Sequence, residues 1–150
     1  MGRPLASVLI HVTFSTQGRQ PAIDEAIEAD AWRYAAAVCA TKQCHPLAVG
    51  GTADHLHLLL SVPPSVAVAA VVDEVKTRLC QWVRSRGERY AEFAWQTGYG
   101  AFSIGQSQRE ALAQYIADQK QHHARSDFQD EFRTLLSRYG VDFDESTVWD

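Results

Sequence analysis

The segment of residues 54–62 constrains the fold of this chain more than any other feature. Its first seven residues read Asp54-His55-Leu56-His57-Leu58-Leu59-Leu60. Side chains two residues apart on a β-strand point to the same side, so His55 and His57 project together while Leu56, Leu58 and Leu60 point into the core. The segment therefore predicts a sheet with one apolar face and one face that carries polar groups.

Two further strands and a helix are predicted around this segment. Residues 7–13 alternate as a half-buried strand does, and apolar residues at helical spacing over residues 23–38 predict a helix. Leu47–Val49 is predicted to pair with residues 54–62. The glycine pair Gly50-Gly51 suits the positive φ of a tight hairpin turn, so we expect it to join these two strands.

The second half of the chain predicts three helices and one strand. A long helix is expected over residues 65–86, with a serine as its N-cap, and a strand over residues 99–104. Residues 107–123 begin with the capping-box pattern Ser-Gln-Arg-Glu, and residues 127–139 predict a last helix with an aspartate cap and a glycine stop. The order β-α-β-β-α-β followed by two helices predicts an α+β fold: a ferredoxin-like antiparallel sheet with C-terminal helices.

The whole chain, residues 1–150, is expected to be a single domain. It is long enough for one sizeable core, and no repeat or low-complexity linker divides it. We expect a core over about residues 5–124, and a C-terminal helix with an acidic tail over residues 125–150. The odd cysteine count indicates a reducing compartment, and no signal peptide or membrane-length apolar run is seen. These features predict a cytoplasmic protein with no membrane partner.

The charge distribution leaves a nucleic-acid partner open. The net charge of −4 argues against one. Residues 76–89, however, hold five basic residues against Glu88 alone. These residues are Lys76, Arg78, Arg84, Arg86 and Arg89. Such a strip can contact DNA phosphates, or it can be a solvated helix face.

Two groups of polar residues carry candidate chemistry. His55 and His57, side by side on a rigid strand, form a two-ligand metal platform; the alternative is a hydrogen-bonded pair of surface histidines. Tyr115, Gln119 and His122 share one face of their predicted helix. The alternative for this second group is an amphipathic helix with a solvated polar face.

Together these segments resemble the single-tyrosine HUH transposases of insertion sequences and the REP-associated tyrosine transposases. The HUH motif of those proteins is a histidine, a bulky apolar residue and a histidine, as in His55-Leu56-His57, and their nucleophile helix carries a tyrosine with a glutamine one turn later, as Tyr115 and Gln119 do here. The resemblance covers most of residues 8–123. Its other segments are His11–Thr16 with Arg19, Pro63-Pro64, Lys76 and Trp95-Gln96-Thr97-Gly98-Tyr99.

The resemblance implies a specific chemistry. His55, His57 and Gln119 would bind one divalent ion, Mg²⁺ or Mn²⁺, and Tyr115 would attack a phosphate of single-stranded or hairpin DNA. The tyrosine would keep the 5′-phosphate and release a 3′-OH, and the protein would associate with the nucleoid of a bacterial-type cell when bound to DNA. Many relatives are homodimers with shared active sites, while others act as monomers.

Other residues are candidates for supporting roles. The basic strip is a candidate for contacts to the DNA backbone, and Trp95 and Tyr99 could either stack on unpaired bases or pack in the core. His11, Asp54 and His122 are candidates for support of the site, and His122 and His123 for contacts to phosphate or metal. Two alternative functions remain: a domesticated relative that binds hairpin DNA without transposition, and a metal-dependent hydrolytic nuclease.

Overall fold

The sheet has four antiparallel strands in the spatial order β2-β3-β1-β4. A computed structural model of the chain describes residues 2–150. The strand order and the helices between the strands confirm the predicted α+β, ferredoxin-like arrangement. The strands are β1 (Leu9–Ser15), β2 (His45–Thr52), β3 (His55–Ser61) and β4 (Gly100–Ile104).

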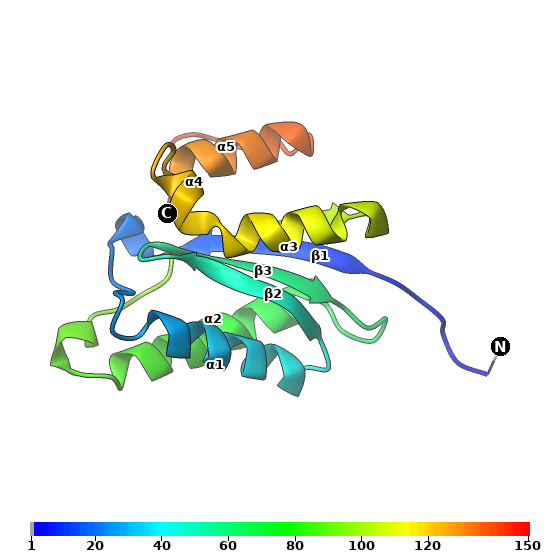
Figure 1. Cartoon of the computed structure of the whole chain (residues 1–150), viewed down its shortest axis with the longest axis horizontal. Helices are drawn as coiled ribbons and strands as arrows, with labels where there is room; N and C mark the ends of the chain where they lie inside the picture. The colour runs from blue at the N-terminus through cyan, green and yellow to red at the C-terminus, as the bar shows by residue number, and fades with distance from the viewer. Residues whose placement is uncertain (1) are drawn as a thin grey trace.

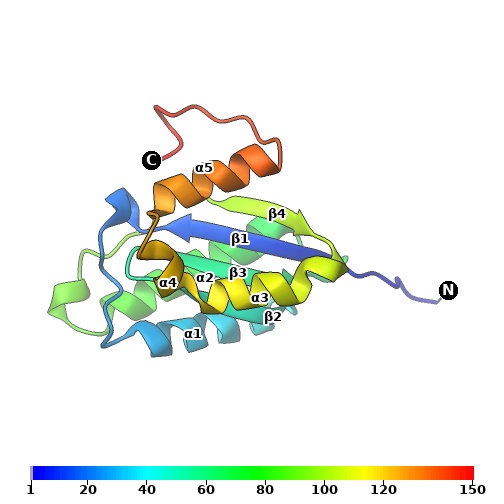
Figure 2. The same ribbon diagram turned by 45° about the horizontal axis from the view of Figure 1, so that its top comes forward.

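Helices cover both faces of the sheet. α1 and α2 lie side by side on one face, whereas α3, α4 and α5 lie over the other, as Figures 1 and 2 show. The face that the sequence predicts to carry polar groups is therefore covered by the chain's own C-terminal helices. The helices are α1 (Glu28–Thr41), α2 (Val68–Arg84), α3 (Arg109–Ala117), α4 (Gln119–His123) and α5 (Phe128–Arg138).

The main core lies between the sheet and the helices α1 and α2. Leu56, Leu58 and Leu60 of β3 are at most 1% exposed and belong to one apolar cluster with residues of both helices, among them Val72 and Leu79 of α2. Full burial of a leucine side chain contributes roughly 1.5–3 kcal/mol. This face of the sheet therefore anchors the fold.

A second, smaller apolar cluster fixes α5 to the edge of the sheet. Phe102 of β4 packs against Phe128 and Phe132 of α5, and Trp149 near the C-terminus also packs against this cluster.

None of the helices within residues 2–150 combines the length and the apolar character that crossing a membrane requires.

The glycine pair Gly50-Gly51 lies inside β2, so the prediction of a hairpin turn there is wrong. β2 continues to Thr52, and β3 begins at His55. Close packing explains the glycines: a Cβ on Gly50 would stand 2.6 Å from the carbonyl oxygen of Ile116 in α3. A larger residue would push α3 away from the sheet.

The predicted helix over residues 107–123 is divided in two. Asp118 has φ −97° and ψ 20°, and it separates α3 from α4. The predicted serine cap is also wrong, because a 3₁₀ turn (Gln106–Gln108) precedes α3. The last helix begins and ends as predicted: the side chain of Asp127 accepts a hydrogen bond from the backbone N–H of Asp130, and Gly140 follows the helix with φ +65°.

The starts of α1 and α2 differ from the predictions. α1 begins at Glu28, later than predicted, and α2 begins at Val68 after Ala67, which provides no side-chain cap. The serine at position 65 therefore lies before the helix it was expected to cap.

Candidate active site

His55 and His57 lie side by side on the polar face of β3, as predicted. Both side chains are fully buried, and their rings meet edge to face with centroids 5.1 Å apart. Strand alternation sends the neighbouring leucines to the opposite side of the sheet. The two imidazoles therefore face the layer formed by α3, α4 and α5.

Two residues that follow the tyrosine helix join the histidine pair. His123 of α4 and Glu131 of α5 each bring one ligand atom to within 4.8 Å of those of His55 and His57. His57 Nε2 lies 2.8 Å from Glu131 Oε1, and His123 Nε2 lies 3.2 Å from Glu131 Oε2. A buried cluster of three imidazoles and one carboxylate can hold a metal ion.

Gln119 belongs to the same cluster. Its Oε1 atom lies 2.8 Å from His55 Nε2 and 3.0 Å from His123 Nε2, and its Nε2 atom donates to Glu131 Oε2 at 3.3 Å. The structure thus brings together the three residues that the family resemblance implies as ligands, His55, His57 and Gln119. Whether they bind a metal remains a prediction.

The outer nitrogens of both β3 histidines are held by neighbouring side chains. His55 Nδ1 lies 2.7 Å from Asp54 Oδ1, and His57 Nδ1 lies 2.8 Å from Nε2 of the buried His11. These contacts fix the ring orientations and aim both Nε2 atoms at the centre of the cluster, which is how metal-binding histidines are generally oriented. His11 and Asp54 therefore lie where supporting residues were expected.

Tyr115 reaches the cluster from α3. Its hydroxyl donates a hydrogen bond to Glu131 Oε2, and its ring centroid lies 6.1 Å from that of His57. The ring of His122 packs against that of Tyr115, with centroids 4.4 Å apart, and does not enter the cluster. Tyr115, Gln119 and His122 thus lie on one side of the α3–α4 segment, as predicted, although the helix is interrupted at Asp118.

Burial and charge set the protonation of the site. Burial raises the pKa of Tyr115, and the Glu131 carboxylate acts in the same direction. Burial alone would raise the pKa of Glu131, but hydrogen bonds from His123 and His57 outweigh it and hold that pKa well below its usual range. Burial and the neighbouring His57 lower the pKa of His11 to about 3. The tyrosine is therefore protonated beside an ionised carboxylate, and the carboxylate depends on positive or hydrogen-bonding partners.

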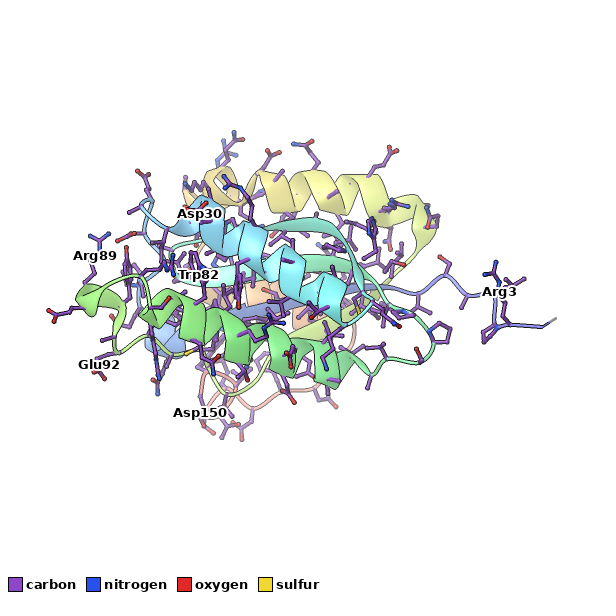
Figure 3. The ribbon with its side chains drawn as sticks, turned by 90° about the horizontal axis from the view of Figure 1, so that it is seen from below. Arg3, Asp30, Trp82, Arg89, Glu92 and Asp150 are labelled. Carbon is purple, nitrogen blue, oxygen red and sulfur yellow. The ribbon has the colours of Figure 1, made fainter. Side chains whose placement is uncertain are left out.

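The basic strip lies across the sheet from the histidines. It belongs to α2 and the loop that follows, and Figure 3 shows Trp82 and Arg89 on this side of the molecule. Lys76 Nζ donates to the carbonyl oxygens of Gln96, Thr97 and Gly98, at 2.8, 3.0 and 2.6 Å.

All four arginines of the strip also contact the chain itself. Arg84 Nε donates to the carbonyl oxygen of Phe93, Arg89 pairs with Asp24, and Arg78 lies near Glu74. Arg86 stacks on Trp82. The strip thus holds the fold together far from the histidines, and its role in DNA contact remains a prediction.

The two aromatic candidates lie apart from the cluster as well. Trp95 packs edge to face against Phe14 and Phe93 beside the main core, whereas Tyr99 is 37% exposed near Lys76. Of the two roles considered for Trp95, base stacking and core packing, the structure therefore favours core packing.

Glu131 is the residue of this site that the sequence did not reveal. It lies on the face of α5 that also buries Phe128, Phe132 and Leu135. The sequence signal that could have identified it is a carboxylate within the apolar stripe of a helix, because such a residue is rarely buried without a partner. Its partner His57 lies 74 positions earlier, which no local pattern indicates.

Comparison with known proteins gives a family and a fold. The sequence profile described as "Transposase IS200 like" matches residues 5–119. No curated protein sequence matches the chain significantly. His123 and Glu131 lie beyond the matched residues.

Two solved structures have a similar fold. A candidate transposase from Deinococcus radiodurans R1 aligns with a TM-score of 0.63 and 18% identity, over 79% of this chain and 96% of the other. A REP-associated tyrosine transposase bound to a REP hairpin aligns with a TM-score of 0.61 and 14% identity, over 81% of this chain and 72% of the other. At these identities the similarity establishes the fold alone.

Proposed function

Because this chain belongs to the family of IS200-like transposases, we propose that it cleaves and rejoins single-stranded or hairpin DNA through a covalent bond between Tyr115 and a 5′-phosphate. One observation carries the proposal: the hydroxyl of Tyr115 donates to the same carboxylate that contacts His57 and Gln119. A nucleophile and a candidate metal centre thus share one hydrogen-bonded network.

A divalent cation fits the donor atoms of this network. His55 Nδ1 contacts Asp54, and His55 Nε2 lies 2.8 Å from Gln119 Oε1 and 3.6 Å from Glu131 Oε1. A neutral imidazole with its proton on Nδ1 presents the lone pair of Nε2 to these oxygens, an arrangement that suits a cation held between the groups.

The proposed ligands are His55, His57 and Gln119, with Glu131 and His123 in reach of the same ion. Imidazoles are softer ligands than Mg²⁺ prefers, so we expect Mn²⁺ to bind more tightly than Mg²⁺ in the test tube. When bound, the ion would polarise the scissile phosphate and offset its charge.

The side chains of this protein define the covalent step. The Oη atom of Tyr115 attacks phosphorus, the bond between phosphorus and the 3′ oxygen breaks, and the released 3′ oxygen takes up a proton. The phenol proton passes to Glu131 Oε2, which already accepts its hydrogen bond, and a proton from Glu131 or from solvent goes to the released 3′ oxygen. The phosphotyrosine keeps the energy of the phosphodiester bond, so the reverse attack by a 3′-OH rejoins strands without ATP.

We propose that residues 1–150 act as one catalytic unit in which Tyr115 serves its own histidines. Exchange of the tyrosine helix within a homodimer is the alternative arrangement. α3 packs on β2 through the contact of Ile116 with Gly50, and an exchanged helix would have to reproduce that contact.

The test is covalent capture of DNA. The protein and its Tyr115→Phe variant are incubated with labelled single-stranded hairpin DNA from the genomic flanks of its gene, with Mn²⁺ or with EDTA, and run on a denaturing gel. We expect a shifted band that requires both Mn²⁺ and Tyr115. Cleavage without a shifted band that persists in Tyr115→Phe would identify a hydrolytic nuclease instead. Retained binding without cleavage would identify a DNA-binding relative.

A further inference from the structure

We propose that the groove between α3 and α5 binds an unpaired DNA strand, whose phosphates contact Arg125 and Arg138. The inference rests on the function proposed above and specifies the surface by which a strand reaches Tyr115. It differs from the sequence prediction, which assigned DNA contact to the strip on α2.

The groove is the open side of the site. It has a volume of about 750 Å³, and Tyr115, His123 and Glu131 contribute to its wall. His55 and His57, by contrast, are fully buried beneath these residues. A phosphate that approaches the nucleophile therefore enters through this groove.

The charges that line the groove suit a polyanion. Arg125, Arg138 and His122 line it, and Glu131 is the one acidic residue among its described lining residues. Glu131 is committed to hydrogen bonds with the imidazoles and the phenol of the site. The lining is thus more basic than the chain as a whole, which carries a net charge of −4.

The two arginines are free to make external contacts. Both are exposed, and no carboxylate within residues 2–150 forms a salt bridge with either of them, whereas Arg89 and Arg133 pair with aspartate or glutamate. Arg138 lines the same groove as Tyr115. A guanidinium at this place can hold a phosphate that lies beside the nucleophile.

Arg138 also lies in the last turn of α5, where a cation interacts favourably with the helix dipole. That effect alone would give it a small role in stability and no role in DNA binding. It does not account for Arg125, which precedes the helix.

The remaining walls match an unpaired strand. Ser107, Gln108 and Thr134 present polar groups, and the ring of Tyr139 stacks on Phe102 with one side on the groove. The volume falls within the range of roughly 300–1,000 Å³ that is typical of ligand pockets. Such a space admits a short run of nucleotides, whose bases can stack on an aromatic ring, but it does not admit a double helix.

Fluorescence anisotropy with labelled oligothymidylate tests the proposal, because this probe forms no hairpin. The protein is titrated in EDTA, which separates binding from cleavage, at several salt concentrations. The groove variant is Arg125→Gln/Arg138→Gln, and the matched control is Arg78→Gln/Arg86→Gln, a half-buried and an exposed arginine on the α2 side. Thermal unfolding of both variants confirms that they fold.

We expect the groove variant to bind about tenfold more weakly, and the slope of log K against log salt to fall in magnitude by about 1.4, since each phosphate contact on a single strand contributes about 0.7. The control variant should keep both values. An unchanged slope in the groove variant, or a loss confined to the control variant, would overturn the proposal. If wild-type protein forms the covalent DNA adduct but the groove variant binds oligothymidylate as wild type does, the groove is not the binding surface and the proposed function still stands.

Discussion

The side chains of adjacent residues in β3 point to opposite sides of the sheet, where their surroundings differ greatly. Leu58 and its neighbours on one side belong to an apolar cluster that includes residues of α1 and α2, and burial of such groups stabilises the fold directly. His57, on the other side, contacts His11 and Glu131. Buried polar groups cost free energy unless they are paired, so the second face depends on a complete network. One face supplies stability, and the other is organised around charge.

The pair Leu58→Ala and His57→Ala gives the largest expected contrast. Leu58→Ala removes a fully buried side chain and should lower the free energy of unfolding by about 2–5 kcal/mol, while Mn²⁺ affinity is retained. His57→Ala should remove most of the Mn²⁺ affinity, because it deletes a proposed ligand. Urea unfolding and Mn²⁺ titration measure the two effects. Unchanged Mn²⁺ affinity in His57→Ala would break the distinction between the faces.

Glu131→Gln sharpens the comparison by keeping the shape of the site and removing its negative charge. If the carboxylate contributes to metal binding, Mn²⁺ affinity should fall about 10–100-fold, as it does for groups of this kind at other metal centres. Glu110→Gln on the exposed side of α3 is the matched control, and calorimetric titration is the measurement. Tighter Mn²⁺ binding in Glu131→Gln would show instead that the carboxylate blocks the site.

Cys39 in α1 gives the smallest expected effect and probes the apolar face. Burial raises the pKa of its thiol to about 12, whereas an unfolded cysteine titrates near ~8.5. Above pH 8.5 the unfolded chain loses this proton and the folded chain keeps it, so stability falls as pH rises toward 12. Between pH 8 and pH 10 the loss should be about 1–2 kcal/mol.

The check is urea unfolding across this range for wild type and Cys39→Ala. The variant should be less stable at pH 8 but should lose less stability on going to pH 10. Parallel curves would show that this thiol does not govern the alkaline behaviour of the apolar face.

The sequence predicts the apolar face better than the polar one, for a physical reason. Alternation in β3 and helical spacing in α1 and α2 are local patterns, and they identify Leu58 and its partners because burial follows from periodicity. The family resemblance likewise identifies His55, His57, Tyr115 and Gln119, which the structure brings to one place.

Contacts between distant segments escape local patterns. Gly50 reads as a turn residue, yet it lies in β2 because Ile116 of α3 packs against it. Glu131 enters the site because an apolar cluster with Phe102 fixes α5 over the sheet. Lys76 suggests a phosphate contact, but its ammonium group is used by three carbonyl groups of the chain itself.

The most direct test of the account is to locate the covalent bond between protein and DNA. The adduct formed with Mn²⁺ is digested with nuclease and trypsin and examined by mass spectrometry. Cleavage after Arg109 and Lys120 releases residues 110–120, in which Tyr115 is the one tyrosine, whereas Tyr139 of the groove falls in residues 139–150. The account predicts a 5′-phosphonucleotide on residues 110–120. A nucleotide on residues 139–150, or cleaved DNA with no nucleotide on any peptide, would contradict it.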